Sequence, residues 1–118
     1  MSQFISLDQA VMMTTLYRAQ KETVLAPPFK DQNILCISET FDREYIDALL
    51  ANPECAKLRI YYGMDKELKV HAIVVPVNKN NEDILPDAAA IKLADGGGIV
   101  EDAQRCPTDC APPSPLNP

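Results

Sequence analysis

The feature that most constrains the fold is the stretch from Leu58 to Asn78, LRIYYGMDKELKVHAIVVPVN, where two strand-like runs flank a short polar turn. In the first run every second residue is apolar, a period of two that predicts a strand with one buried and one wetter face. The buried-face residues are Leu58, Ile60 and Tyr62, and Arg59 and Tyr61 lie between them. At the turn, Gly63 is expected to adopt a backbone angle that other residues resist.

The second run, Val70 to Val77, has apolar residues on both of its faces. This pattern is typical of a strand that is covered on both sides or that lies centrally in its sheet. Pro76 has no backbone donor, so we expect the ladder to end there or to run along an edge. The two runs together predict an antiparallel hairpin. Because a two-stranded hairpin is only marginally stable, other elements must complete it.

Two helices are predicted before the hairpin. Ser6 and Gln9 have the spacing of a capping box, and a helix is expected from about Leu7 to Leu25, where Pro27 and Pro28 follow. Its apolar stripe is broad enough to lie on a sheet, and the stripe consists of Ala10, Met13, Tyr17 and Val24, with Leu7, Val11 and Leu16 nearby.

For the second helix, Asp42 is the expected N-cap and Phe41 is expected to pack on Ile46, and Asn52-Pro53 ends the helix. Residues 33–37, NILCI, fit either a strand or a buried connector. We therefore predict an α+β fold, in which an antiparallel sheet centred on the hairpin carries two packed helices. Residues 1–102 form this single domain, and residues 103–118 form a flexible Pro-rich tail.

Composition narrows the function classes. The chain has 118 residues, 47% of them hydrophobic and 24% charged, with a net charge of -6. The dispersed Lys and Arg residues argue against nucleic acid and anionic membranes as partners. Neither a signal peptide nor a membrane span is visible in the sequence, so the expected location is the cytoplasm.

The segment Cys106-Pro-Thr-Asp-Cys110 is a candidate for metal binding or for thiol chemistry. The three-residue spacing is permitted for a zinc half-site, whose other ligands would come from Cys36, Cys55 or His71. A reversible thiol pair is the redox alternative, although the motif lacks C-x-x-C spacing. Ordinary thiols remain the preferred interpretation, and His71 is interpreted as a satisfied core or rim histidine rather than a general base.

Two other segments resemble ligand-binding loops but lack the required residues. Residues 78–83 are rich in oxygen ligands yet lack the glycine and glutamate of a calcium loop. Gly96-Gly-Gly98 lacks the Lys-Ser/Thr that follows a phosphate loop. We predict a solvated turn and a joint respectively, and no cofactor. A further short strand or helical turn is expected within residues 84–93.

Several of these residues also carry a resemblance. The helix FDREYIDALLANPEC, the turn RIYYGMD, the loop before Asp83 and the segment CPTDC with a terminal SPLNP resemble a family of small uncharacterised bacterial proteins. The family has an RIYYG-type hairpin and a C-terminal cysteine-proline segment, and the resemblance covers residues 41–118. It implies a cytoplasmic chain and brings no activity, so it assigns no catalytic residue.

The absence of a catalytic constellation favours a non-enzymatic interaction or adaptor protein, whose partner is another protein or a second copy of the chain. A small zinc or thiol-redox module is the alternative, and an enzyme is the least favoured reading. Exposed aromatic and Arg side chains on a strand are typical of protein contacts, and polyproline segments are often docked by other domains. The expected interaction residues are Arg59, Tyr61, Pro112, Pro113, Pro115 and Leu116.

Overall fold

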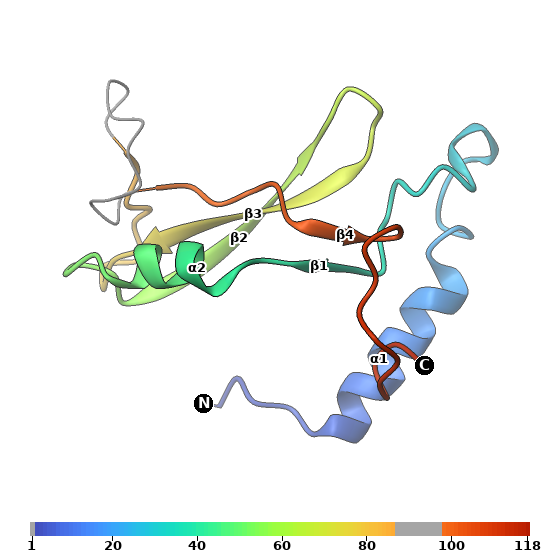
Figure 1. The fold of residues 1–118 in the computed structure, drawn as a ribbon, viewed down its shortest axis with the longest axis horizontal. Helices are drawn as coiled ribbons and strands as arrows, with labels where there is room; N and C mark the ends of the chain where they lie inside the picture. Colours follow the sequence, from blue (N-terminus) through green and yellow to red (C-terminus); the bar gives the residue numbers. More distant parts are fainter. Residues whose placement is uncertain (1, 87–97) are drawn as a thin grey trace. The chain divides into compact units, whose positions relative to one another are not determined.

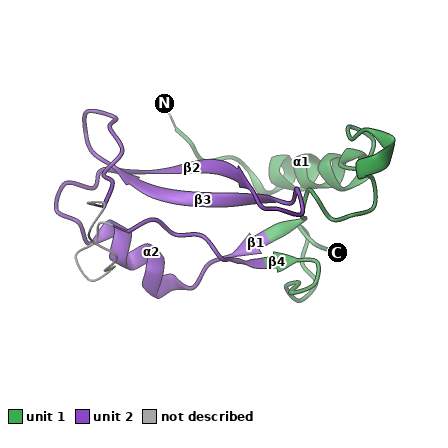
Figure 2. Cartoon of the chain, turned by 90° about the horizontal axis from the view of Figure 1, so that it is seen from above, with its two compact units in different colours: residues 1–38, 105–118 green, residues 39–104 purple. Residues whose placement is uncertain are grey.

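The computed structural model describes residues 2–86 and 98–118, which form two α-helices and two small antiparallel sheets (Figure 1). The predicted α+β class is therefore confirmed. The chain divides into two compact units: unit 1 combines Met1–Ser38 with Arg105–Pro118, and unit 2 is Glu39–Gln104 (Figure 2). No helix in the described ranges is long and apolar enough to cross a membrane.

In unit 1, helix α1 (Leu7–Gln20) begins at the predicted capping box. The Gln9 N–H donates to Ser6 Oγ at 3.1 Å, and the Ser6 N–H donates to Gln9 Oε1 at 3.0 Å. The helix was predicted to reach Leu25 but ends at Gln20. The residues that follow include the β-branched pair Thr23-Val24, which favours helices weakly, and they form turns instead. No described residue of α1 is buried.

Residues 33–37 form a connector rather than a strand. The connector follows a short 3-10 helix, η1 (Pro27–Phe29). Ile34 is its one buried side chain, and the Arg105 guanidinium donates to the carbonyls of Asn33 and Ile34 at 3.1 and 3.0 Å. The connector then leads into β1 (Ser38–Thr40), which pairs with β4 (Gln104–Cys106).

In unit 2, strands β2 (Lys57–Met64) and β3 (Val70–Val77) form the predicted antiparallel hairpin, in unbroken register from Lys57↔Val77 to Met64↔Val70. The turn between them is held by Asp65, whose Oδ1 accepts from the N–H groups of Glu67 and Lys69 at 2.8 and 3.0 Å. The sequence therefore predicted the hairpin and its polar turn correctly.

The expected role of Gly63 is wrong. Gly63 lies inside β2, and its φ is outside the left-handed region that favours glycine. A Cβ at this position would lie 2.7 Å from Cδ1 of Ile73 on the facing strand. Gly63 therefore leaves room for the end of the Ile73 side chain and does not make the chain turn.

Helix α2 (Arg43–Leu50) packs on β3. Its residue Leu49 is fully buried and belongs to the core cluster with Val74 and Val100. Phe41 and Ile46 both pack against this cluster, and the predicted contact between the two residues stays a prediction. Asp42 occupies the predicted N-cap position, although its side chain makes no capping hydrogen bond.

Candidate functional site

One face of β2 is apolar and exposed, although the sequence predicted that it would be buried. The exposed fractions of Leu58, Ile60, Tyr62 and Met64 are 40%, 53%, 79% and 61%. In the described ranges, α2 packs on β3 and leaves this face of β2 open to solvent. The prediction of a buried face is wrong because the core of unit 2 forms around β3 alone.

The outer edge of β2 is also open. On β3, the backbone groups of Ala72, Val74 and Pro76 point away from β2: the Ala72 N–H donates to Glu39 Oε2, Val74 bonds with Val100, and the Pro76 carbonyl accepts from Ile84. Because antiparallel strands alternate inward and outward pairs, the residues opposite them on β2 also point their backbone groups outward. These residues are Leu58, Ile60, Tyr62 and Met64.

The same alternation explains Pro76. Its nitrogen faces the outer edge of β3, so the missing N–H removes no bond to β2, and the strand continues to Val77. On β2, by contrast, no strand of the described ranges pairs with the outer edge. Four apolar side chains and the outward backbone groups of the same four residues therefore meet on one open strand, which we call the β2 edge surface.

Arg59 and Tyr61, the predicted contact residues on this strand, both bind Asp83. Arg59 Nη1 donates to one carboxylate oxygen, and the Tyr61 hydroxyl donates to the other at 2.5 Å. Arg59 Nη2 also donates to Asn81 Oδ1 at 2.7 Å. The pKa of Arg59 is raised, chiefly by hydrogen bonding with Tyr61 and then by Asp83. Both residues thus fasten the loop at 78–83 to the hairpin, and the Tyr61 ring stays 45% exposed.

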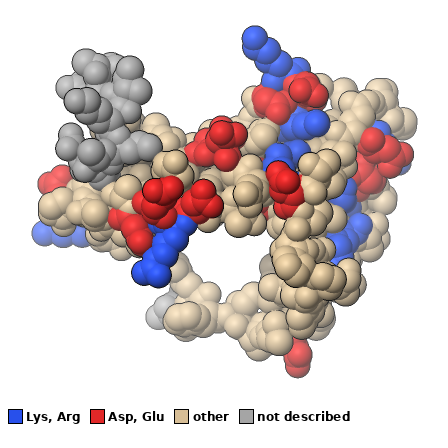
Figure 3. All heavy atoms as spheres, in the orientation of Figure 1, with Lys and Arg blue, Asp and Glu red and all other residues tan. Residues whose placement is uncertain are grey.

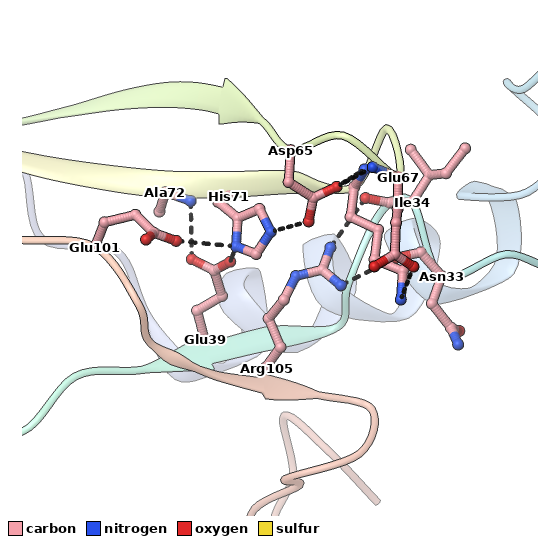
Figure 4. Close-up of polar contacts among 10 residues, drawn as sticks. Asn33, Ile34, Glu39, Asp65, Glu67, His71, Ala72, Glu101 and Arg105 are labelled. Carbon is pink, nitrogen blue, oxygen red and sulfur yellow. Dashed lines mark hydrogen bonds and ion pairs between the residues drawn. The ribbon is translucent and has the colours of Figure 1, made fainter.

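His71 lies among three carboxylates (Figure 4). Its Nε2 is 2.7 Å from Asp65 Oδ2, and its Nδ1 is 3.2 Å from Glu101 Oε1 and 3.7 Å from Glu39 Oε1. The hydrogen bond with His71 lowers the pKa of Asp65, and the Lys69 N–H adds to this effect. The contacts agree with the interpretation of His71 as a satisfied rim histidine. They link the hairpin turn to the segments that carry Glu39 and Glu101.

A depression of about 410 Å³ opens beside this cluster, with His71, Glu101 and Asp102 in its lining. Its lining is acidic, but no group of His, Cys, Asp and Glu side chains in the described ranges has a geometry that could hold a metal ion. On the face drawn in Figure 3, Lys and Arg side chains lie among Asp and Glu side chains.

The four cysteines fall into two groups. Cys106 and Cys110 form a disulfide, and Cys36 and Cys55 are not disulfide-bonded. Cys106 is buried and Cys110 is exposed. The preferred interpretation of ordinary thiols is therefore wrong for Cys106 and Cys110, because their two sulfurs are bonded to each other. In this form neither sulfur is a thiolate that could bind zinc, so the zinc alternative stays a hypothesis for the reduced chain.

The predicted docking residues of the C-terminal segment, Pro112, Pro113, Pro115 and Leu116, are all exposed. The Leu116 carbonyl accepts from Arg18 Nη1 at 2.7 Å, and Ser114 and Asn117 pair through their backbones. The flexibility predicted for residues 103–118 stays a prediction. Residues 87–97 lie outside the described ranges, and with them most of the predicted 84–93 element and Gly96-Gly97; residues 84–86 form neither helix nor strand.

Sequence reasoning missed two features of unit 2. The carboxylates around His71 come from positions 39, 65 and 101, and the sequence has no local signal that joins them. The β2 edge surface was visible as a pattern, but its apolar face was assigned to the core. The alternation of apolar residues that includes Tyr62 and Met64 indicates that something covers this face, but it does not indicate whether the cover is the core or another chain.

No protein-family model, no curated protein and no solved structure matches this chain.

Proposed function

We propose that this protein is a non-enzymatic interaction protein that binds another polypeptide chain through the β2 edge surface. The observation that carries the proposal is the coincidence, on one strand, of an open backbone edge with four exposed apolar side chains. An open, flat and apolar edge strand is a template for pairing with another chain.

The backbone supplies the affinity in this binding mode. An extended segment that adds to β2 would bond to the N–H and C=O groups of Leu58, Ile60, Tyr62 and Met64, as in other cases of strand addition. The four side chains lie on one face of the strand, so they would pack against alternate side chains of the added segment. Burying them removes apolar surface from water, at about 25 cal/mol for each Å².

The opposite face of β2 supports the same role. Arg59 and Tyr61 are held in place by Asp83, so their side chains lose little further freedom when a partner binds. Tyrosine and arginine are enriched in protein interfaces. The predicted contact residues thus lie on the face opposite the four apolar residues, which provide most of the contact area.

The test is affinity capture from a lysate of the native host, with quantitative mass spectrometry. Full-length wild type is compared with Ile60→Lys, which places a charge on the edge surface. The matched control is Met12→Lys, which changes an apolar residue on α1 that is 72% exposed, compared with 53% for Ile60. We expect the wild type and Met12→Lys to capture the same chain, and Ile60→Lys to lose it. Capture that Ile60→Lys leaves unchanged contradicts the proposal.

The disulfide favours a second candidate, a thiol-disulfide exchange protein. A substrate thiolate would attack the exposed Cys110 sulfur, the S–S bond would break, and Cys106 would leave as a thiolate. A second substrate thiolate would then attack the substrate sulfur of the mixed disulfide, which releases an oxidised substrate and the Cys110 thiolate. The buried position of Cys106 leaves Cys110 as the accessible sulfur.

Thiol titration of the full chain in glutathione redox buffers tests this candidate. We expect two thiols to titrate in oxidising buffer and four in reducing buffer, with the change reversed on reoxidation. The Cys110→Ser variant should show three thiols under both conditions. Four titratable thiols in the oxidising buffer would exclude the exchange role, because no disulfide would then be available to react.

A further inference from the structure

We infer that the β2 edge surface pairs with the β2 edge surface of a second copy of this chain, antiparallel, with Tyr61 facing Tyr61 on the two-fold axis. The inference rests on the proposed function and names its partner. The product is a continuous four-stranded sheet, β3-β2-β2-β3, in which each hairpin gains the third strand that an isolated hairpin lacks.

The register follows from the backbone alone. Only residues whose N–H and C=O point outward can bond across the new interface, so these residues must face one another. A two-fold axis at Tyr61 places Leu58 opposite Met64 and Ile60 opposite Tyr62, which pairs all four outward residues. An axis at Ile60 leaves Met64 without a partner of this kind, and an axis at Tyr62 does the same to Leu58.

The side chains agree with this register. On the apolar face, Leu58 meets Met64 and Ile60 meets Tyr62, and an aromatic residue beside a β-branched one is a favourable cross-strand pair. On the other face, Lys57 of each copy lies opposite Asp65 of its partner, which places opposite charges at both ends of the interface while the Asp65 carboxylate keeps its contacts with the turn and with His71. The charges are therefore self-complementary, as a two-fold interface requires.

The strand also lacks two of the devices that keep edges apart, and its charged residues, Lys57 and Arg59, lie on the face opposite the apolar side chains. Strand β2 contains no proline and no bulge, and no charged residue occupies any of its four outward positions. Monomeric proteins usually protect an edge of this length with at least one of these features. Their absence over eight residues favours an edge that is paired in solution.

The interface is small, since it consists of one strand from each copy. We therefore expect a reversible dimer with a dissociation constant in the range of about 1 to 100 µM rather than an obligate one. Each copy carries a net charge of -6, so the measurement belongs at about 0.15 M salt, where repulsion beyond about 8 Å is screened.

The first experiment is sedimentation velocity of the purified full chain over about 1 to 200 µM. The mass should rise from 13.0 kDa towards twice that value as concentration increases. Tyr62→Pro removes an outward N–H and leaves the inner ladder intact, as natural Pro76 does on β3. We expect this variant to stay monomeric. Tyr62→Thr keeps the N–H and introduces a β-branched side chain that favours strands, so it should dimerise more weakly than the wild type but measurably.

The second experiment tests the register by cross-linking. In a Cys36→Ser, Cys55→Ser background, Tyr61→Cys places two cysteines at a non-hydrogen-bonded pair, whose Cα atoms lie about 4.5 Å apart and within disulfide range. Arg59→Cys is the matched control, because it also loses a bond to Asp83 and its two copies would be about 13 Å apart along the strand. Non-reducing gels should show a dimer band for Tyr61→Cys that is at least tenfold stronger.

The outcomes separate the two proposals. A wild type that stays monomeric at all concentrations overturns self-pairing, and so does dimerisation that Tyr62→Pro retains with a native circular dichroism spectrum. Equal cross-linking of the two cysteine variants overturns the Tyr61-centred register. If the chain is monomeric but its capture of another protein still depends on Ile60, self-pairing fails and the proposed function stands.

Discussion

Strands β2 and β3 belong to one hairpin and have the same length, yet they have opposite surroundings. Strand β3 uses both of its edges and packs under α2, and its residues from Val74 to Val77 are buried. Strand β2 uses one edge and exposes its apolar face. An apolar pattern therefore specifies which residues can be buried together, whereas the position of the strand in the sheet decides whether those residues are buried.

The contrast between the two strands can be tested by truncating two residues that face each other across the hairpin. Ile60 and Val74 are cross-strand partners, but Ile60 is 53% exposed and Val74 is 4% exposed. Val74→Ala should lower the free energy of unfolding by about 2 to 3 kcal/mol, because it leaves a cavity in the core. Ile60→Ala removes more atoms but should cost less than about 1 kcal/mol.

Urea unfolding, at a protein concentration low enough to keep the chain monomeric, measures both values. Equal losses for the two variants would show that β2 is covered as well as β3, and the contrast between the strands would then disappear. Tyr62→Thr is the control, since an exposed side chain at a neighbouring position should change the free energy of unfolding little.

A second prediction concerns the close contact that joins the two strands at Gly63. The Cβ of Gly63→Ala would lie 2.7 Å from Ile73 Cδ1, so we expect a loss of about 1 kcal/mol in the free energy of unfolding. Ile73→Val removes that methyl group and should restore most of the loss in the double variant. Additive losses in the double-mutant cycle would mean that the alanine is resisted for another reason.

A smaller effect is expected at the turn of the hairpin, where Asp65, the residue after β2, contacts His71 of β3. The pKa of Asp65 is lowered in the folded chain, so its carboxylate adds stability above the unfolded pKa of about 4. This contribution is lost as the pH falls through the lower folded pKa. The difference in unfolding free energy between wild type and Asp65→Asn should therefore shrink from pH 6 to acid. Glu67→Gln, at an exposed carboxylate of the same turn, should show a smaller change with pH.

Local patterns predicted the parts of the fold that depend on neighbours in sequence. The capping box at Ser6 rests on contacts within a few residues, and the hairpin register rests on strict alternation. The predicted end of α1 at Leu25 is too late. The helix ends at Gln20, ahead of the weak helix formers Thr23 and Val24, and does not extend to the residues before Pro27.

The candidate site was predictable only in part. Arg59 and Tyr61 were correctly placed on the face opposite the apolar residues, but their partner Asp83 is more than twenty residues away in sequence and left no periodic signal. The pairing of Cys106 with Cys110 was one of several alternatives that spacing alone allowed. Contacts of this kind depend on how the backbone folds back on itself.

The hairpin of residues 58–77 can be predicted from the order of residues alone, because alternation of side chains is a property of the strand itself. Which of the two strands is covered depends instead on contacts between distant parts of the chain. Leu49 of α2 packs on Val74 of β3, and the outer edge of β3 is hydrogen-bonded to Val100 and Ile84. The apolar face and open edge of β2 remain because burial depends on long-range packing, which the order of residues along the strand does not specify.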